Sequence, residues 1–136
     1  MKECNYSIVI PVFNSERSLR DLYNRVNTTF QKINKSFEII FVEDGSSDGS
    51  WDEIMKLKQE FPDIVRGIRF TKNFGQHNAL LCGFRFTKGE WVITMDDDLQ
   101  TPPEEITKLI NKINESKTDL VYGKYDTKQH SFVRNT

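Results

Sequence analysis

The stretch that decides the fold lies near the start of the chain and reads Tyr6-Ser7-Ile8-Val9-Ile10-Pro11-Val12. It is an almost continuous apolar run with a proline close to its end. Such a run is typical of a strand that is covered on both faces, as parallel strands usually are. We therefore predict that this strand lies at the centre of a sheet and that the rest of the chain supplies its neighbours and the helices that cover them.

Helical and strand patterns alternate after this run. The predicted helices cover about 19–34, 50–61, 76–88 and 103–113, and the further predicted strands cover 37–42, 65–71, 91–95 and 120–123. This alternation predicts right-handed crossovers and an α/β fold, with a mainly parallel sheet and helices on both faces. Ligands of such sheets bind at the carboxyl ends of the strands, so the loops after the first four strands should meet at one edge.

Three consecutive carboxylates, Asp96, Asp97 and Asp98, follow the fourth predicted strand. If the backbone stays extended, residues 96, 98 and 100 share one face at intervals of about 6.6 Å, and Asp97 points away. Carboxylates this close repel each other unless a cation lies between them, and ligands that are all oxygen suit Mg or Mn. We therefore predict a metal site of Asp96, Asp98 and Gln100 that takes its remaining ligands from a diphosphate.

The same loop also allows a simpler interpretation as a helix cap. Thr101 precedes Pro102, and Glu104 follows three residues after the threonine, which matches a capping box with proline at the first helical position. The cap needs none of the three aspartates, so both interpretations can hold. An EF-hand is excluded because its glycine and its final bidentate glutamate are missing.

Length and composition indicate one domain. The chain has 136 residues, is 37% hydrophobic and has a net charge of -1, which argues against broad nucleic-acid binding. No stretch contains the roughly 18 apolar residues of a membrane helix, and the N-terminus does not resemble a signal peptide. Cys4 lies near the terminus and Cys82 in a helical pattern, and two cysteines placed so differently indicate reduced thiols in the cytosol; neither has a metal-ligand spacing. Residues 125–136 form a polar tail without apolar periodicity.

Two common phosphate-binding signatures, G-x-G-x-x-G and G-x-x-x-x-G-K-[ST], are absent from the sequence. This argues against a dinucleotide-binding or P-loop protein. Asp44 instead follows the second predicted strand, where its carboxylate can accept hydrogen bonds from a base or a ribose while Ser46 donates one. A turn-forming role explains the serine equally well.

Four motifs occur in order along the chain: IVIPVFNSE at 8–16, VEDGSSD at 42–48, KNFGQHNA at 72–79 and DDDLQTPPE at 96–104. Together they resemble the inverting glycosyltransferases of family 2, which have the GT-A fold, and the resemblance covers essentially the whole chain. The last two motifs are most similar to polyprenyl-phosphate glycosyltransferases, including those that use dolichyl or undecaprenyl phosphate. The run Asn-Phe-Gly-Gln-His favours the bacterial group that handles 4-amino-arabinose precursors.

This resemblance implies a Rossmann-like GT-A domain that binds a UDP-, GDP- or dTDP-sugar with Mg or Mn. The sugar would pass to an acceptor, a polyprenyl phosphate, in cell-envelope glycan biosynthesis. The implied nucleotide-sugar-binding residues are Pro11, Phe13, Asn14, Glu16, Asp44, Ser46, Asn73, Gly75, Asp96 and Asp97. The implied metal ligands are Asp96, Asp98 and Gln100, with Asp98 as the catalytic residue. No catalytic base is assigned, because a phosphate acceptor is already anionic at neutral pH.

The sequence departs from the family pattern in three places. Glu43 lies where a second aspartate is common, and Lys72 lies where arginine is common. The family also continues into an acceptor-binding half, commonly with interfacial or membrane-spanning helices, whereas this sequence ends at Thr136. We therefore expect residues 1–136 to be a single nucleotide-sugar-binding domain, the N-terminal part of a longer enzyme at the cytoplasmic face of a membrane.

Membrane contact is expected only through C-terminal parts that this sequence lacks, and no oligomeric state is predicted. Two other function classes stay open beside the transferase. One is a binding module that keeps the nucleotide-sugar pocket without catalysis, and the other is a sugar-phosphate nucleotidyltransferase with a similar sheet. Turnover would separate the first from an enzyme, and release of pyrophosphate from a nucleoside triphosphate would indicate the second.

Overall fold

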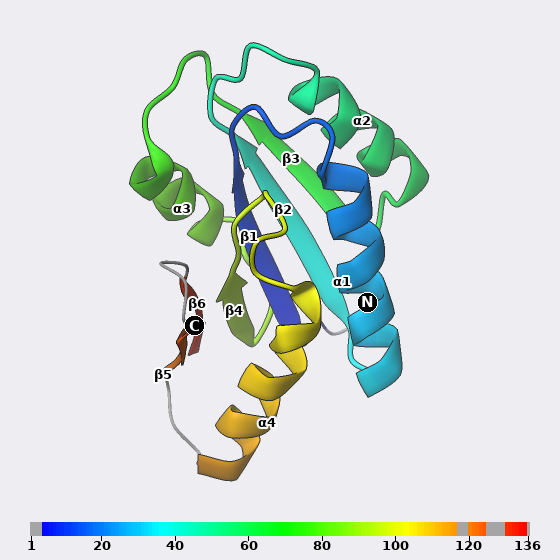
Figure 1. Cartoon of the computed structure of the whole chain (residues 1–136), viewed down its shortest axis with the longest axis vertical. Helices are drawn as coiled ribbons and strands as arrows, with labels where there is room; N and C mark the ends of the chain where they lie inside the picture. The colour runs from blue at the N-terminus through cyan, green and yellow to red at the C-terminus, as the bar shows by residue number, and fades with distance from the viewer. Residues whose placement is uncertain (1–3, 117–119, 125–129, 136) are drawn as a thin grey trace.

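The computed structural model describes residues 4–116, 120–124 and 130–135, the last two ranges by their backbone (Figure 1). Its elements are β1 (Tyr6–Val12), α1 (Leu19–Ile33), β2 (Phe37–Glu43), α2 (Ser50–Glu60), β3 (Val65–Arg69), α3 (Gln76–Phe84), β4 (Trp91–Thr94), the short 3-10 helix η1 (Pro103–Glu105), α4 (Ile106–Ser116), β5 (Leu120–Lys124) and β6 (His130–Asn135). The predicted alternation of strands and helices is confirmed.

The described strands form a six-stranded sheet of order β3-β2-β1-β4-β6-β5. β1 lies inside the sheet and pairs in parallel with β2 on one side and with β4 on the other. β3 continues the parallel part at the edge beyond β2. All residues of β1 are buried, so the position predicted for the opening apolar run is confirmed, and so is the mainly parallel sheet.

The sequence does not predict β6. Residues 125–136 read as a polar tail, yet His130–Asn135 pairs antiparallel with β4 on one side and with β5 on the other. Residues 125–129 and 136 lie outside the described residues. The tail prediction is therefore wrong for 130–135. A strand between two partners satisfies its backbone groups on both sides, so it can form without the apolar alternation that sequence analysis relies on.

The helices cover the two faces of the sheet unequally. On one face, α1, α2 and α4 share the larger core with residues such as Ile8 and Phe41 (Figure 1). Within the described residues, α3 covers the opposite face, where Ala79 packs in a smaller cluster with Val9 and Ile40. Helices on both faces are thus confirmed. In the described part of the chain, no helix combines the length and the apolar character needed to span a membrane.

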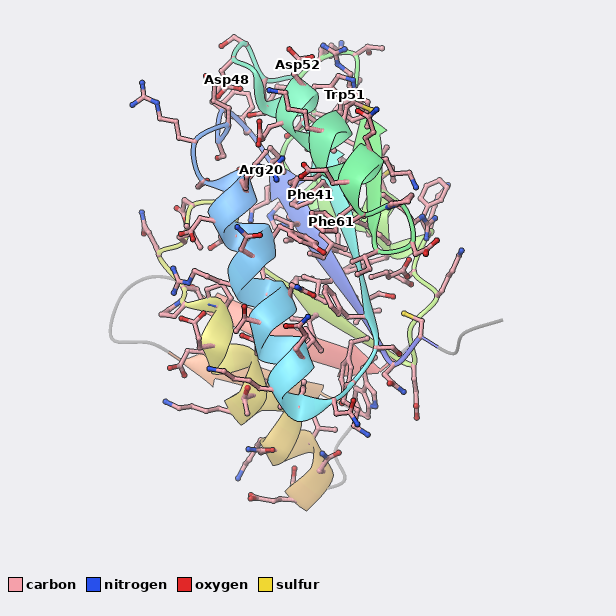
Figure 2. The ribbon with its side chains drawn as sticks, turned by 90° about the vertical axis from the view of Figure 1, so that its right-hand side faces the viewer. Arg20, Phe41, Asp48, Trp51, Asp52 and Phe61 are labelled. Carbon is pink, nitrogen blue, oxygen red and sulfur yellow. The ribbon has the colours of Figure 1, made fainter. Side chains whose placement is uncertain are left out.

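An aromatic contact joins α1 to the end of α2. The rings of Tyr23 and Phe61 are stacked, with centroids 4.2 Å apart. Phe61 is partly buried and packs against the larger core, to which Phe41 of β2 belongs; both are labelled in Figure 2. Arg20 of α1 pairs with Glu53 and Glu60 of α2 at the surface. These contacts hold α1 and α2 side by side, so the loops that lead into the two helices are held close together at the carboxyl edge of the sheet.

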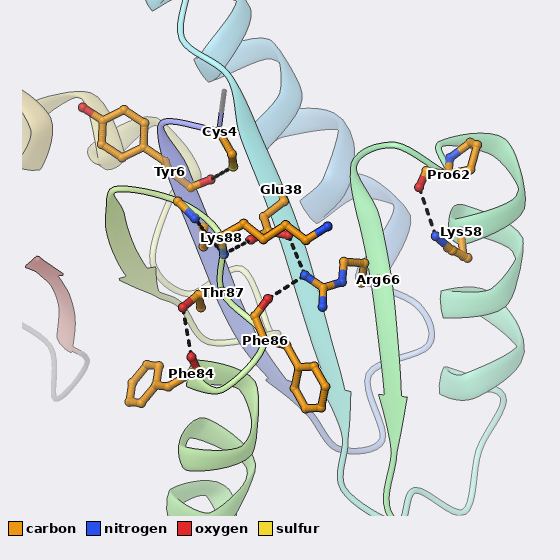
Figure 3. Close-up of polar contacts among 12 residues, drawn as sticks. Cys4, Tyr6, Glu38, Lys58, Pro62, Arg66, Phe84, Phe86, Thr87 and Lys88 are labelled. Atoms are coloured by element: carbon orange, nitrogen blue, oxygen red, sulfur yellow. Dashed lines mark hydrogen bonds and ion pairs between the residues drawn. The ribbon is translucent and has the colours of Figure 1, made fainter. Parts of the chain in front are cut away.

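A buried polar cluster closes the amino edge of the sheet (Figure 3). Glu38 of β2 accepts hydrogen bonds from the Ser7 hydroxyl at 2.6 Å and from the Lys88 backbone amide at 2.7 Å. The Arg66 guanidinium donates to the same carboxylate at 2.9 Å and to the Phe86 carbonyl at 2.6 Å. The cluster therefore ties three strands to the turn between α3 and β4.

Candidate functional site

A pocket of about 270 Å³ opens at the carboxyl edge of the parallel strands. Its walls come from the end of β1, the loops after β1, β2 and β4, and the first residue of α3. The lining residues are Pro11, Val12, Phe13, Asp44, Gln76, Asp96, Asp97 and Asp98. Loops far apart in the sequence thus meet as parallel topology requires, and four aspartates surround one hollow.

Six of the twelve predicted site residues line this pocket. The six are Pro11, Phe13, Asp44, Asp96, Asp97 and Asp98, whereas Asn14, Glu16, Ser46, Asn73, Gly75 and Gln100 are not in its lining. Sequence reasoning missed Val12 and Gln76. Gln76 donates a hydrogen bond from Nε2 to Asp96 Oδ1 at 3.3 Å, and its place in the third motif was the one signal that could have found it.

The Asp97 carboxylate is turned towards the loop after β1. Its Oδ2 accepts hydrogen bonds from the Phe13 amide at 2.9 Å and from the Ser15 hydroxyl at 2.6 Å. Its backbone carbonyl accepts a third from the Ser18 hydroxyl at 2.6 Å. Burial raises the pKa of Asp97 above its ordinary value, although the hydrogen bonds from the Ser15 hydroxyl and the Phe13 backbone amide oppose the shift. Asp97 therefore holds the loop after β4 (residues 95–102, the acidic loop) against the loop after β1, a role that the resemblance does not assign to it.

The Asp44 carboxylate is buried and holds the loop that leads into α3. Its Oδ1 accepts the Phe74 amide at 2.7 Å, and its Oδ2 accepts the Gly75 amide at 3.1 Å and the Asn73 side-chain amide at 3.3 Å. A carboxylate offers about four lone-pair sites, so these donors leave room for about one more. Asp44 thus shapes the pocket wall, and a ligand hydrogen bond would share this carboxylate with the loop.

Glycine is required where this loop passes the end of β2. Gly45 has a φ of 75°, and a Cβ there would lie 2.4 Å from the Asn73 backbone nitrogen. Gly75 also has a positive φ, 96°, but a Cβ there would meet no atom within 4 Å. The close approach of the two loops therefore depends on position 45 both for its conformation and for its lack of a side chain.

The loops after β1 and β2 are joined through Asn14. Its backbone amide donates to Ser46 Oγ at 2.9 Å, and its Oδ1 accepts the Ser47 amide at 2.8 Å. The Glu16 amide donates to Asp48 Oδ2 at 3.3 Å. Asn14 and Ser46, both predicted to bind the nucleotide sugar, are thus part of the frame that supports the pocket.

The acidic loop is not extended, so the predicted arrangement of residues 96, 98 and 100 on one face is wrong. β4 ends at Thr94, and Leu99 has a left-handed φ of 62°. Asp98 Oδ1 accepts the backbone amide of Gln100 at 3.1 Å, the hydrogen bond of an Asx turn. Because the chain turns here, Asp96 and Asp98 line the pocket while Gln100 lies outside its lining.

The predicted helix cap at Thr101 is also wrong. η1 starts at Pro103 with Pro102 before it, and no side-chain hydrogen bond caps it. Glu104 instead accepts two hydrogen bonds from Arg25 of α1, at 2.6 and 3.2 Å. These bonds lower the pKa of the Glu104 carboxyl below its usual value. Because Pro102, and not Thr101, immediately precedes η1, Glu104 is the second residue of the helix and does not have the position of a capping-box glutamate.

A divalent cation is compatible with the pocket. Asp96 and Asp98 both line it. In the described part of the chain, no three His, Cys, Asp or Glu side chains lie close enough together to hold an ion by themselves. Two carboxylates suit an Mg-type ion, which keeps few protein ligands and takes the rest from water and substrate phosphates. Oδ2 of Asp97 already accepts two hydrogen bonds from the loop after β1.

A second hollow of about 380 Å³ adjoins the loop after β2 and is lined by Glu43, Gly45, Ser46, Arg69, Phe70 and Thr71. Glu43, which lies where the family often has aspartate, is 1% exposed. Its carboxylate accepts the Ser46 amide and pairs with Arg69 Nε at 3.6 Å. The longer side chain therefore braces the loop after β2.

Comparison with known proteins identifies the family of the chain. The family described as Glycosyl transferase family 2 matches residues 7–136. The chain is 39% identical over 130 residues to the undecaprenyl-phosphate 4-deoxy-4-formamido-L-arabinose transferase of Salmonella choleraesuis (strain SC-B67). The alignment covers 96% of this chain and 39% of the relative, so the chain spans about two fifths of the length of the curated relatives it matches.

Solved structures show the same fold. A mannosyltransferase from Pyrobaculum calidifontis in complex with GDP-Man and Mn2+ superposes with a TM-score of 0.72 at 17% identity, over 88% of this chain and 35% of that one. A glucosyl-3-phosphoglycerate synthase from Mycobacterium tuberculosis, in complex with Mn2+, UDP and phosphoglyceric acid, gives 0.71 at 18% identity, over 92% and 44%. The family match and the shared architecture together establish that this chain belongs to glycosyltransferase family 2 and has the GT-A fold.

Proposed function

We propose that this chain is the donor-binding part of a metal-dependent inverting glycosyltransferase that moves a sugar from a nucleotide diphosphate to a polyprenyl phosphate in cell-envelope glycan biosynthesis. The observation that carries the proposal is the pocket at the carboxyl edge, where Asp44, Asp96 and Asp98 surround one hollow. The name of the Salmonella relatives includes undecaprenyl phosphate, and two structures of the same fold hold GDP-Man or UDP with Mn2+. These names support the choice of donor and acceptor class.

The nucleoside is proposed to lie between Phe13 and Asp44. The Phe13 side chain is 47% exposed at the pocket wall, so its ring can cover a base. Asp44 has room for about one further donor, such as a base N–H or a ribose hydroxyl. Pro11 adds an apolar wall. Asn14, Ser46, Asn73 and Gly75 would act by holding the loops, and Glu16 by its amide contact to the loop after β2.

The diphosphate is proposed to lie against Asp96 and Asp98, with Mg or Mn between the carboxylates and the phosphate oxygens. When bound, the cation neutralises charge that builds on the leaving diphosphate. Gln100 can join the ligands only if the turn at 98–100 opens, because this turn, closed by the hydrogen bond from the Gln100 backbone amide to Asp98, leaves Gln100 outside the pocket lining. Asp97 keeps the acidic loop against the loop after β1, and thereby sets the distance between the phosphate end and the nucleoside end of the pocket.

Residues 1–136 are proposed to be one nucleotide-sugar-binding domain that works as the N-terminal part of a longer enzyme at the cytoplasmic face of a membrane. The coverage of 39% of the Salmonella relatives supports this. On this proposal the 136-residue chain binds donor and metal but transfers no sugar. Efficient metal-dependent transfer of labelled sugar to a short-chain polyprenyl phosphate by this chain alone would contradict it.

Calorimetry with nucleoside diphosphates and nucleotide sugars, with Mn or Mg and without either, tests donor binding. We expect binding that requires the cation. Asp98→Asn should abolish the cation-dependent part without loss of stability, because asparagine keeps an oxygen for the Gln100 amide while the carboxylate repulsion falls.

The matched control is Asp52→Asn, which removes the charge of an exposed aspartate on α2. It should bind as the unmodified chain does. Equal binding by Asp98→Asn would remove Asp98 from the metal site. Absence of binding to every nucleotide tested would overturn the donor assignment, and pyrophosphate release from a nucleoside triphosphate would indicate a nucleotidyltransferase.

A further inference from the structure

The segment around α3 differs from the rest of the chain in charge. Residues 64–89 contain five of the 19 Lys and Arg side chains and none of the 20 Asp and Glu side chains. α3 itself, Gln76–Phe84, carries no acidic or basic residue apart from His77. An acid-free run of this length stands out in a chain whose net charge is -1. Arg66 and Arg69 pair with Glu38 and Glu43, so the excess positive charge of the segment comes from Lys72, Arg85 and Lys88.

The same segment exposes large apolar side chains. Phe74, Leu81 and Phe86 are 45%, 62% and 45% exposed, and they account for three of the five large hydrophobic residues that are exposed in the described part of the chain. They lie before, within and after α3, so they are spread along a helix about 13 Å long. α3 buries only Ala79 and Gly83. Within α3 the exposed large apolar side chain is Leu81, and Phe74 and Phe86 add exposed rings just beyond its two ends.

Unpaired cations flank these apolar groups. None of the ion pairs within the described residues involves Lys72, Arg85 or Lys88. Lys72 Nζ lies 5.2 Å from the centre of the Phe74 ring, so one charge sits directly beside an exposed aromatic side chain. Arg85 follows the last residue of α3 and precedes Phe86. Each end of the helix thus combines an exposed phenylalanine with a cation.

We propose that this α3 face, made of Lys72, Phe74, Leu81, Arg85, Phe86 and Lys88, binds the surface of an anionic lipid bilayer. Apolar side chains can enter the boundary between headgroups and acyl chains, and nearby Lys and Arg attract anionic headgroups. RNA, another anionic partner, would bind the cations but would offer no acyl chains for Leu81 to contact. A second copy of the chain would bring two basic faces together, which their repulsion opposes.

This contact differs from the expectation that the protein contacts the membrane only through C-terminal parts. The proposal does not depend on the proposed sugar transfer, but membrane binding at this face would help the transfer. The Phe74 amide donates to Asp44, which lines the pocket, so the α3 face adjoins the pocket wall. A bilayer at this face would therefore lie beside the site at which a lipid phosphate acceptor has to arrive.

Co-sedimentation of the 136-residue chain with lipid vesicles tests the proposal. Vesicles of phosphatidylcholine that contain phosphatidylglycerol should bind the chain, vesicles of phosphatidylcholine alone should not, and added salt should weaken the binding. Leu81→Glu and Arg85→Glu should each lower the partition coefficient by about tenfold or more. The matched controls lie on α2: Met55→Glu changes an apolar side chain that is 36% exposed, and Lys56→Glu changes a cation whose side chain is 67% exposed. Both controls should bind like the unmodified chain.

Fluorescence gives a second measurement that does not rely on loss of binding. The emission of Leu81→Trp should shift to shorter wavelength when phosphatidylglycerol vesicles are added, whereas that of Met55→Trp should not. No binding of the folded chain to these vesicles, or equal binding by all four charge variants, would overturn the proposal. A dimer that Leu81→Glu dissociates, or RNA binding without vesicle binding, would overturn it in favour of those partners. Nucleotide calorimetry on Leu81→Glu should match the unmodified chain, so a failure of the donor proposal is recognised separately.

Discussion

Replacing Arg66 by alanine tests how much the buried polar cluster at the amino edge stabilises the fold (Figure 3). The Glu38 carboxylate would keep its hydrogen bonds from Ser7 and from the Lys88 amide. It would lose the guanidinium at 2.9 Å and, with it, the compensating charge. The Phe86 carbonyl would lose a donor as well. The variant therefore leaves a buried charge that is only partly compensated.

The expected loss follows from the burial of the pair. Removing one partner of a fully buried ion pair costs about 3–5 kcal/mol, whereas an exposed pair contributes about 0–1 kcal/mol. The Glu38 side chain is 6% exposed and the Arg66 side chain 28%, so water can partly replace the guanidinium. We therefore expect Arg66→Ala to lower the free energy of unfolding by about 2–3 kcal/mol.

Urea unfolding followed by circular dichroism measures this loss as a shift of the midpoint at unchanged slope. Arg20→Ala is the matched control, because Arg20 also pairs with two groups but its side chain is 39% exposed. Arg20→Ala should lower the free energy of unfolding by less than about 1 kcal/mol. If Arg66→Ala costs no more than Arg20→Ala, the argument from burial is refuted. A double-mutant cycle that combines Arg66→Ala with Glu38→Gln should show a coupling free energy, since the two side chains are in contact.

Three further predictions concern the edge loops and the pH dependence. Asp44→Ala should lower the free energy of unfolding by about 1–3 kcal/mol, because the amides that it accepts lose their acceptor, and hydrogen exchange of those amides should quicken. Nucleoside diphosphate affinity should fall with it. Gly45→Ala should unfold the chain or abolish nucleotide binding, while Gly75→Ala, with open space for its Cβ, should show a milder loss in the same melting and binding assays. Arg25 lowers the pKa of Glu104 by its hydrogen bond, so the pair stabilises the fold above the unfolded pKa and its contribution is lost as the pH falls through the folded pKa. Arg25→Ala should remove that part of the acid dependence of urea unfolding, which amounts to less than about 1 kcal/mol because the Glu104 side chain is 54% exposed.

Most of the fold could be predicted because its elements carry strong local patterns. β1 is apolar throughout, as a strand covered on both faces must be, and α1 repeats apolar residues at helical spacing. A chain in which such strands and helices alternate is compatible with only a few topologies, and a parallel sheet is one of them. β6 was missed because its pairing with β4 and β5 is a contact between distant backbone segments, and backbone pairing leaves little trace in side-chain type.

The sequence was enough to locate the candidate site, but it did not predict the hydrogen bonds that its residues make. The parallel topology predicts that the edge loops meet, and six of the predicted residues do line one pocket. The sequence did not predict the individual roles of these residues. Asp97 and Asp44 have the residue type of a ligand-binding group, yet their carboxylates accept hydrogen bonds from loops about 30 to 80 residues away in the sequence. Which donors come near a carboxylate depends on the assembled loops, so residue type alone does not distinguish a ligand contact from a support.

What the sequence by itself determined is the family, the order of strands and helices, and the edge of the sheet at which the motifs gather. Each of these depends on local periodicity or on motifs of adjacent residues. The tertiary structure alone decided that the chain turns at Leu99, so that Asp98 stays in the pocket and Gln100 leaves it. It also decided that Asp97 serves the loop after β1. The physical reason is that a turn and a hydrogen bond between distant loops are chosen by the packing of the whole edge, where buried carboxylates take the donors that the fold brings within reach.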